Sequence, residues 1–204
     1  MAQPALARRT QAERSETMRA RLASAAYGAV AEGGLSALTM RSVAAAAGAS
    51  PGALLHHFPD KQALIIAAIA HALTLARDDS AVWLETQTDS PEAALRAMLA
   101  EFRSFFFSDR FWVAMGITIE TTKDPALGPA IRREVGELRS PIYRQWATRL
   151  ELAGWTPAEA VKTVRAGASL VSGAAVRRFW ADSDAITAEI EEDWIAGRLA
   201  RLAR

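Results

Sequence analysis

Apolar residues recur every three to four positions along almost the whole chain, which is the spacing of amphipathic α-helices. One such stripe runs through residues 14–32 and is formed by Met18, Leu22, Ala25 and Ala29. No segment alternates apolar and polar residues as a half-buried strand does, and no internal repeat is present. The 204-residue chain is therefore expected to be all-α.

Glycine and proline mark where the expected helices begin and end. Gly33-Gly34 and Gly48 end the first two helices, and Ser50-Pro51 begins the third as N-cap and first helical residue. Pro141 falls inside one expected helix, as a kink or as a break. We expect about nine helices, near residues 14–32, 40–47, 51–58, 61–85, 91–107, 110–122, 129–152, 157–181 and 185–203.

Charged and aromatic residues are distributed unevenly along the chain. Residues 1–76 contain 7 Lys and Arg against 4 Asp and Glu, whereas the remainder contains 17 against 19. Of the 15 aromatic residues, 13 lie beyond residue 80, including all six tryptophans. This asymmetry predicts two units, a small basic front and a larger, aromatic-rich back.

The composition excludes several classes of protein. The chain has no cysteine, which rules out a disulfide scaffold and a thiolate metal site and favours a reducing compartment. No apolar run is long enough to cross a bilayer, and the N-terminus has no apolar segment of a secretory signal. We expect a cytoplasmic protein without a membrane segment.

Three short helices, the last two joined by a Gly-Ala-Ser turn at residues 48–50, predict a helix-turn-helix at the front of the chain. In this motif a short second helix supports a third, whose N-terminal residues enter the major groove of DNA. A step of 100° per residue from the inward-facing Leu54 gives an outward surface formed by Gly52, Ala53, Leu55 and His56.

The run from Leu22 to Leu64 contains GGLSALTMRSVAAAAGASPGALLHHFPDKQAL and resembles the DNA-binding domain of the tetracycline-repressor (TetR) family of transcriptional regulators. The resemblance implies a homodimer of nine-helix subunits, whose C-terminal domain binds a small ligand that releases the DNA. The implied organisation is a flexible basic arm over residues 1–13, a helix-turn-helix domain over 14–60, and a ligand-binding and dimerisation domain over 61–204.

The resemblance also implies roles for residues at the front of the chain. Thr39 would hold a phosphate, Arg41 would reach a base or a phosphate, and Lys61 would contact a phosphate. The implied DNA-binding residues are Thr39, Arg41, Ser50, Pro51, Gly52, Ala53, Leu55, His56 and Lys61.

Two positions depart from the family pattern. Leu55 stands where the family usually has a tyrosine, and Ala53 where threonine or serine is frequent, so two hydroxyls that could bind phosphate are missing. Leu55 could contact a thymine methyl instead. Affinity would then depend more on the basic residues Arg41 and Lys61 and, in the arm, Arg8, Arg9 and Arg14.

Each assignment has a simpler alternative. The arm could be an ordinary solvated terminus, and Arg41 and Lys61 could be ordinary surface charges. His56 could be a surface histidine without a base contact. His57 is expected to pack toward the core.

Two enzymatic patterns are rejected. Residues 48–52 match the G-x-S-x-G pattern of a hydrolase, but an alanine-rich helix precedes them where that mechanism needs a strand. A di-iron bundle needs Glu-x-x-His pairs, and none of the three histidines has a glutamate three residues before it. We therefore expect that the protein is not an enzyme and that it has no catalytic residue, no metal and no cofactor.

The aromatic-rich back half contains candidates for a ligand pocket, since such pockets are mainly apolar with few polar anchors. Any one of these residues could instead belong to the hydrophobic core. The candidates are Phe105, Phe106, Trp112, Met115, Ile119, Tyr143 and Trp146.

The last two expected helices have the features of a dimer interface. Residues 166–175 read AGASLVSGAA, and such small residues allow helices to approach closely. The final helix carries two apolar stripes, one for its own subunit and one for a partner: Ile186-Ile190-Trp194 and Ile195-Leu199-Leu202. We expect a symmetric four-helix contact between two chains.

Together these features predict a homodimeric, sequence-specific DNA-binding regulator, and more specifically a repressor that a small-molecule effector releases from double-stranded operator DNA. The alternative is a helical small-molecule-binding or ligand-modifying protein that uses its N-terminal domain only structurally. The missing hydroxyls at Ala53 and Leu55 favour that alternative.

Overall fold

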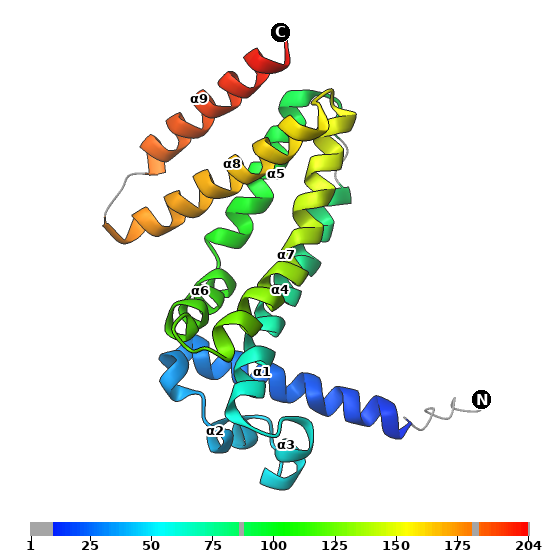
Figure 1. Ribbon diagram of the computed structural model, residues 1–204, viewed down its shortest axis with the longest axis vertical. Helices are drawn as coiled ribbons and strands as arrows, with labels where there is room; N and C mark the ends of the chain where they lie inside the picture. The colour runs from blue at the N-terminus through cyan, green and yellow to red at the C-terminus, as the bar shows by residue number, and fades with distance from the viewer. Residues whose placement is uncertain (1–9, 86–87, 181–183, 204) are drawn as a thin grey trace, which may run out of the picture. The chain divides into compact units, whose positions relative to one another are not determined.

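The computed structural model describes residues 10–85, 88–180 and 184–203, and within these ranges it contains no strand (Figure 1). The expected all-α fold is confirmed, and each of the nine expected helices is found in the described part of the chain. The helices are α1 (Gln11–Ala37), α2 (Met40–Ala46), α3 (Pro51–His57), α4 (Lys61–Glu85), α5 (Pro91–Phe106), α6 (Asp109–Thr121), α7 (Leu127–Leu152), α8 (Pro157–Arg177) and α9 (Asp184–Leu202), with a 3-10 turn over Arg178–Trp180.

Helix α1 begins earlier than expected because its first turn is capped on both sides. The Oγ1 of Thr10 accepts a hydrogen bond from the amide of Glu13 at 3.2 Å, and the Glu13 carboxylate accepts one from the amide of Thr10 at 2.7 Å. This reciprocal pair is a capping box, which fixes a helix start. Residues 11–13, which we expected in the arm, are therefore helical. Arg8 and Arg9 lie outside the described residues.

Two expected interruptions have different outcomes. Gly33 and Gly34 leave the helical conformation, the latter with a φ of 69°, but one more turn follows and α1 ends only at Ala37. Pro141 causes no break, because α7 continues through it.

The chain divides into two compact units, Met1–His71 and Ala72–Arg204, and the boundary falls inside α4. The core of the first unit consists of aliphatic side chains and one phenylalanine. Its most buried large side chains are Leu22, Leu38, Leu54, Phe58, Leu64 and Ile69. Our assignment of DNA binding to residues 14–60 and of ligand binding to residues 61–204 remains a prediction.

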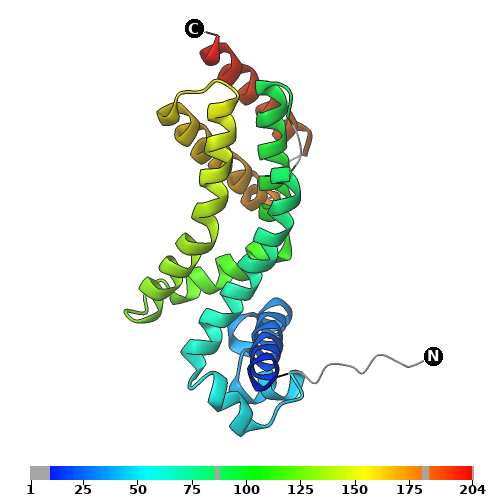
Figure 2. The ribbon, with the colours of Figure 1, turned by 90° about the vertical axis from the view of Figure 1, so that its right-hand side faces the viewer.

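In the second unit α8 lies against both α5 and α7, α6 contacts the same two helices, and α9 contacts α5 and α8 (Figure 2). Gly167 of α8 allows this close packing. A Cβ at this position would lie 3.0 Å from Cε of Met98 in α5 and 3.4 Å from the ring of Trp194 in α9. Arg96 of α5 also holds α9, donating to both carboxylate oxygens of Glu192 at 2.6 and 2.7 Å.

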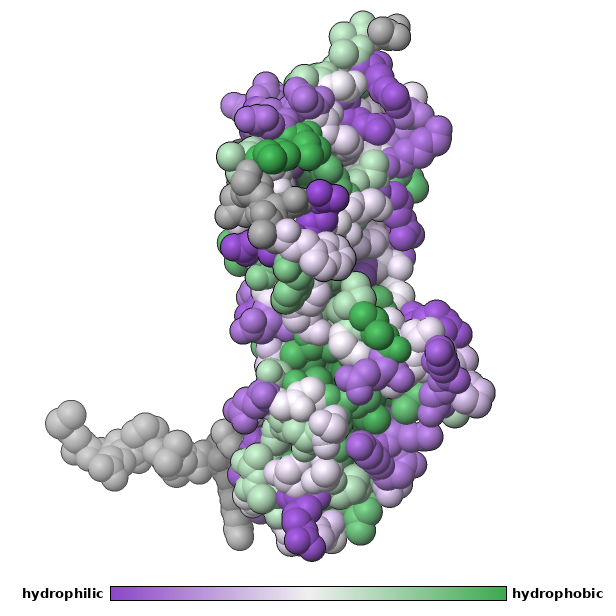
Figure 3. Space-filling model, turned by 90° about the vertical axis from the view of Figure 1, so that its left-hand side faces the viewer, coloured by the Kyte–Doolittle hydropathy of each residue, from purple (hydrophilic) through white to green (hydrophobic). Residues whose placement is uncertain are grey.

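No helix in the described ranges is long and apolar enough to cross a membrane. Apolar side chains nevertheless reach the surface of the second unit. Figure 3 shows hydrophobic surface, in green, at several places on one face of the molecule. The large exposed apolar side chains of the second unit include Phe179, Trp180, Ile186 and Ile190.

Candidate nucleic-acid interface and ligand cavity

Thr39 and Ser42 close the start of α2 by a reciprocal pair of hydrogen bonds. Thr39 Oγ1 accepts from the amide of Ser42, and Ser42 Oγ accepts from the amide of Thr39, both at 3.0 Å. Val43 and Ala44 bury the inner side of the helix, and Arg41 is exposed on its outer side. Both predicted DNA contacts of this helix, Thr39 and Arg41, therefore lie at the surface.

Helix α3 has a sharply divided environment. Ser50 Oγ accepts a hydrogen bond from the amide of Ala53 at 3.1 Å, and Pro51 occupies the first helical position, so the helix begins where the sequence predicts. Leu54 is 1% exposed, whereas the neighbouring Leu55 is 53% exposed. One side of this short helix thus anchors it, and the other is open to solvent.

The open side of α3 has the composition that the sequence predicted. Gly52, Leu55 and His56 are exposed, and Ala53 is half-buried. A Cβ at Gly52 would meet no atom within 4 Å, so the fold itself does not require a glycine there. The missing side chain leaves room for a partner to approach the backbone closely. We call Gly52, Leu55 and His56 the α3 surface.

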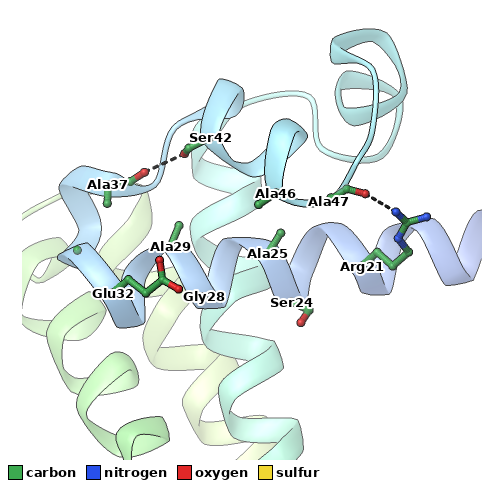
Figure 4. A pocket seen from close by; sticks show the side chains of 11 residues that line it. Arg21, Ser24, Ala25, Gly28, Ala29, Glu32, Ala37, Ser42, Ala46 and Ala47 are labelled. Carbon is green, nitrogen blue, oxygen red and sulfur yellow. Dashed lines mark hydrogen bonds between the residues drawn. The ribbon is translucent and has the colours of Figure 1, made fainter.

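The turn between α2 and α3 is held from α1. Gly48 has a φ of 59°, a left-handed conformation that favours glycine. One residue earlier, the carbonyl oxygen of Ala47 accepts a hydrogen bond from Nη2 of Arg21 (Figure 4). An open groove of about 590 Å³ runs along α1 and α2. Figure 4 shows small side chains such as Ala25 and Ala46 lining it.

A second arginine of α1 supports the end of α3. Arg19 donates to the carbonyl oxygen of His57 at 3.1 Å, and its guanidinium lies 4.7 Å from the ring centroid of Phe58. Our sequence reasoning gave no role to Arg19 or Arg21. The available signal was their position on the two flanks of the apolar stripe of α1.

Lys61 is the first residue of α4 and is exposed. The residue before it, Asp60, caps the helix by accepting a hydrogen bond from the amide of Ala63 at 2.8 Å. All nine predicted DNA-binding residues lie in the first unit, and all but the half-buried Ala53 are exposed. The surface they form is therefore compatible with contact to a large partner.

Ser50, the serine of the rejected hydrolase pattern, caps α3, and Asp60 caps α4. His71 lies 5.6 Å from the ring of Tyr27, and burial lowers the pKa of its imidazole. Within the described residues no group of three or more His, Asp or Glu side chains is placed to hold a metal ion.

A partly open cavity of about 380 Å³ lies within the second unit and is lined mainly by α5, α6 and α7. We call it the bundle cavity. Its volume is in the lower part of the range for small-molecule sites. One wall is aromatic and contains Phe105, Phe106 and Phe111, whose rings contact one another with centroids 5.0 to 5.7 Å apart.

Four of the seven predicted pocket residues line the bundle cavity: Phe105, Phe106, Met115 and Tyr143. The other three do not line it, and their part in ligand binding remains a prediction. Trp146 is fully buried in the helix core, Ile119 is 66% exposed, and Trp112 packs with its ring 4.6 Å from that of Phe179. These residues share helices with the lining residues but lie on other faces or turns, which amino-acid type alone does not reveal.

The polar part of the cavity wall was not predicted. It consists of Thr118, Arg132, Arg139, Ser140 and Arg165. A signal was present in the sequence of α7, where the lining positions 132, 135, 136, 139, 140 and 143 follow helical spacing. Aromatic content alone does not reveal this stripe, because four of its six residues are arginine, serine or glycine.

A helix-turn-helix with an open third helix, carried on the same chain as a helical unit with a partly open cavity, defines a class of DNA-binding transcriptional regulators. Residues 22–68 match the family model described as bacterial regulatory proteins, tetR family. Over 173 residues the chain is 31% identical to the HTH-type transcriptional regulator CymR of Pseudomonas putida, a match that covers 85% of each protein. The chain belongs to the TetR family of transcriptional regulators.

Solved structures show the same fold. A TetR-family regulator from Mesorhizobium loti aligns with a TM-score of 0.68 and 19% identity, covering 93% of this chain and 97% of that one. A transcriptional regulator from Saccharomonospora viridis in complex with choline aligns with a TM-score of 0.66 and 18% identity, covering 88% and 94%. The family membership shown by the model match and by the similarity to CymR confirms the expected class, a DNA-binding regulator.

Proposed function

We propose that this regulator is a repressor that binds its operator as a homodimer and is released when a small molecule occupies the bundle cavity. The observation that carries the proposal is the contrast between Leu54, which anchors α3, and Leu55, which is exposed beside Gly52 and His56. A recognition helix needs this division, since one side must pack and the other must enter the groove.

The α3 surface would supply the base contacts. The imidazole of His56 can donate and accept hydrogen bonds at base edges, and Leu55 can contact a thymine methyl group. At Gly52 the backbone itself can approach the bases. Such contacts give sequence preference rather than bulk affinity.

Arg41 and Lys61 would supply most of the phosphate contacts. The hydroxyl of Thr39 already accepts from the amide of Ser42 and donates to the Ser42 hydroxyl at 2.9 Å. It is therefore less available to phosphate than the resemblance implied. Because Ala53 and Leu55 also lack hydroxyls, the two exposed cations carry a larger share of the affinity.

The dimer contact would lie on α8 and α9. On α8 the small residues Ser169 and Gly173 are exposed, and on α9 Ile190 is 48% exposed while Ile195 is buried within its own subunit. Two such faces related by a twofold axis would form a four-helix contact. The dimer would present two α3 helices to half-sites roughly 34 Å, or a multiple of that distance, apart.

Ligand release requires that the cavity and the DNA-binding surface affect each other. Helix α4 carries Lys61 at its start and the cavity residue Leu73 three turns later, so the same helix takes part in both. A 100-fold loss of operator affinity needs a coupling free energy of only about 2.7 kcal/mol. Since the proposed partner is bacterial DNA, the protein would act in the cytoplasm.

Selection of bound sequences from a random DNA pool tests this proposal. We expect enrichment of an inverted repeat whose half-sites are one or more helical turns apart, and a complex that contains two protein chains. The matched control is the double variant Arg41→Ala, Lys61→Ala, which should recover much less DNA of any sequence. A wild-type selection that enriches no sequence would contradict the proposal.

A further inference from the structure

Arg139 of α7 is a buried cation in the wall of the bundle cavity. It is 4% exposed, and its guanidinium carbon lies 4.0 Å from the ring centroid of Phe105 and 5.4 Å from that of Tyr143. Among the described residues, none of its three side-chain nitrogens has a hydrogen-bond partner. A guanidinium carries five N–H donors, and burying them unmatched costs free energy. This side chain is therefore suited to donate hydrogen bonds to an acceptor group of a ligand inside the cavity.

Glu101 of α5 is close to Arg139 but does not satisfy it. Its Oε1 lies 3.6 Å from Nη1 of Arg139, which is too long for a hydrogen bond, and accepts a short hydrogen bond from the hydroxyl of Ser80. Glu101 is buried but is not part of the cavity wall. The carboxylate thus offsets part of the charge of Arg139 and leaves its N–H donors without a partner.

The remaining charges of the cavity also favour an anion. Arg132 and Arg165 line it together with Arg139, whereas no Asp or Glu occurs among its described lining residues. Three guanidinium groups would repel a cationic ligand such as a quaternary ammonium. Glu101 can balance only one of the three, so the site keeps an excess of positive charge.

We propose that the bundle cavity binds a small organic acid, whose carboxylate pairs with Arg139 while its apolar body lies against the wall of Phe105, Phe106 and Phe111. The planar guanidinium fork matches the two oxygens of a carboxylate. Arg132 and Arg165 are exposed and attract the anion toward the site. The proposal rests on the proposed function for its regulatory meaning and names the class of effector.

Calorimetric titration of the full chain tests this inference without DNA. The probes are benzoate, phenylacetate and octanoate, each paired with its neutral amide and, for benzoate, with phenyl phosphate. We expect at least one acid to bind, and its amide to bind about 10- to 100-fold more weakly. Arg139→Met should weaken binding of the acid by a similar factor and leave the affinity for the amide unchanged. The organic-acid proposal would be overturned by equal affinity for acid and amide, by preference for the phosphate, or by no acid bound at millimolar concentration.

Gly136→Leu provides a second test that leaves the buried charges in place. Gly136 lines the cavity, and a Cβ there would meet no atom within 4 Å, so leucine can fill the space. This variant should lose acid binding and unfold at a higher temperature, because a helical glycine is replaced. The matched control is Gly116→Leu on α6, outside the cavity, where a Cβ is equally free of contacts. Acid binding that persists in Gly136→Leu would contradict the location.

The inference and the proposed function fail in different ways. If the chain binds its operator but no acid, only the organic-acid inference is wrong. If an acid binds through Arg139 but leaves operator affinity unchanged, the site is supported and release by this ligand is contradicted.

Discussion

The guanidinium of Arg21 donates a hydrogen bond to the carbonyl oxygen of Ala47 and so joins α1 to the C-terminal end of α2. Ala47 precedes Gly48, where the left-handed backbone turns the chain toward α3. A cationic donor is favoured at this place because the C-terminal end of a helix carries partial negative charge. The contact therefore helps to set how α3 is presented within the helix-turn-helix.

Arg21→Ala tests this role. The substitution should lower the free energy of unfolding by about 1 kcal/mol, the contribution of a partly exposed hydrogen bond to a charged donor. It should weaken operator binding several-fold without changing base preference, because Arg21 positions α3 and does not itself contact DNA. Chemical denaturation and binding isotherms measure the two effects. The control is Ser15→Ala, an exposed residue of the same helix. A changed base preference in Arg21→Ala would show that this arginine contacts the bases.

Gly52→Ala separates folding from recognition. Because a Cβ at this position meets no atom within 4 Å, the variant should fold normally and gain about 0.5–1 kcal/mol from the better helix former. The added methyl should nevertheless lower operator affinity at least about 10-fold if the backbone of Gly52 lies against base edges. Gly116→Ala gives the same helical gain in the second unit and should leave DNA binding intact. Unchanged operator affinity in Gly52→Ala would remove Gly52 from the interface.

Lys61→Ala tests the phosphate contacts. Loss of one phosphate contact should weaken binding by a similar factor for every DNA sequence and reduce the slope of log affinity against log salt by about 1. Lys123→Ala, an exposed lysine of the second unit, is the control and should leave the slope unchanged. If Lys61→Ala keeps the wild-type slope, this ammonium is an ordinary surface charge.

His71 should make stability depend on pH. Burial lowers the pKa of its imidazole below the usual value near 6.5, so at mildly acidic pH the unfolded chain binds more protons than the folded one. Above about pH 6.5 His71 is neutral in both states and does not lower the free energy of unfolding. This free energy decreases as the pH falls toward the pKa of the folded state. Denaturation of wild type and His71→Gln between about pH 5.5 and pH 7.5 should show that the free energy of unfolding falls less in the variant as the pH is lowered. Equal losses would mean that other groups control stability in this range.

Local patterns were sufficient to predict the helices and the orientation of α3. The capping of α3 by Ser50 and the 100° step from Leu54 depend only on neighbouring residues, and both agree with the structure. The start of α1 was missed although the Thr10–Glu13 capping box is also local. That error came from following the apolar stripe rather than the caps.

Contacts between distant segments could not be predicted in this way. Arg21 and Ala47 lie 26 residues apart, and their contact depends on how α1 and α2 cross. The same limit applies to the cavity wall. Trp146 and Tyr143 are both aromatic residues of α7, but only the packing of α5 and α8 against α7 decides that one is core and the other is cavity wall. Arg139 was missed because the helical spacing of the α7 lining residues does not by itself show which arginine is buried in the cavity wall.

Sequence-specific recognition by α3 is tested most directly by the equilibrium affinity of wild type and His56→Ala for a selected operator and for a scrambled duplex, measured over a range of salt concentrations. We predict that wild type binds the operator at least about 10³-fold more tightly than the scrambled duplex. His56→Ala should lower this ratio while keeping the wild-type salt dependence. Equal wild-type affinity for both duplexes at every salt concentration would contradict the assignment of α3 as the recognition helix.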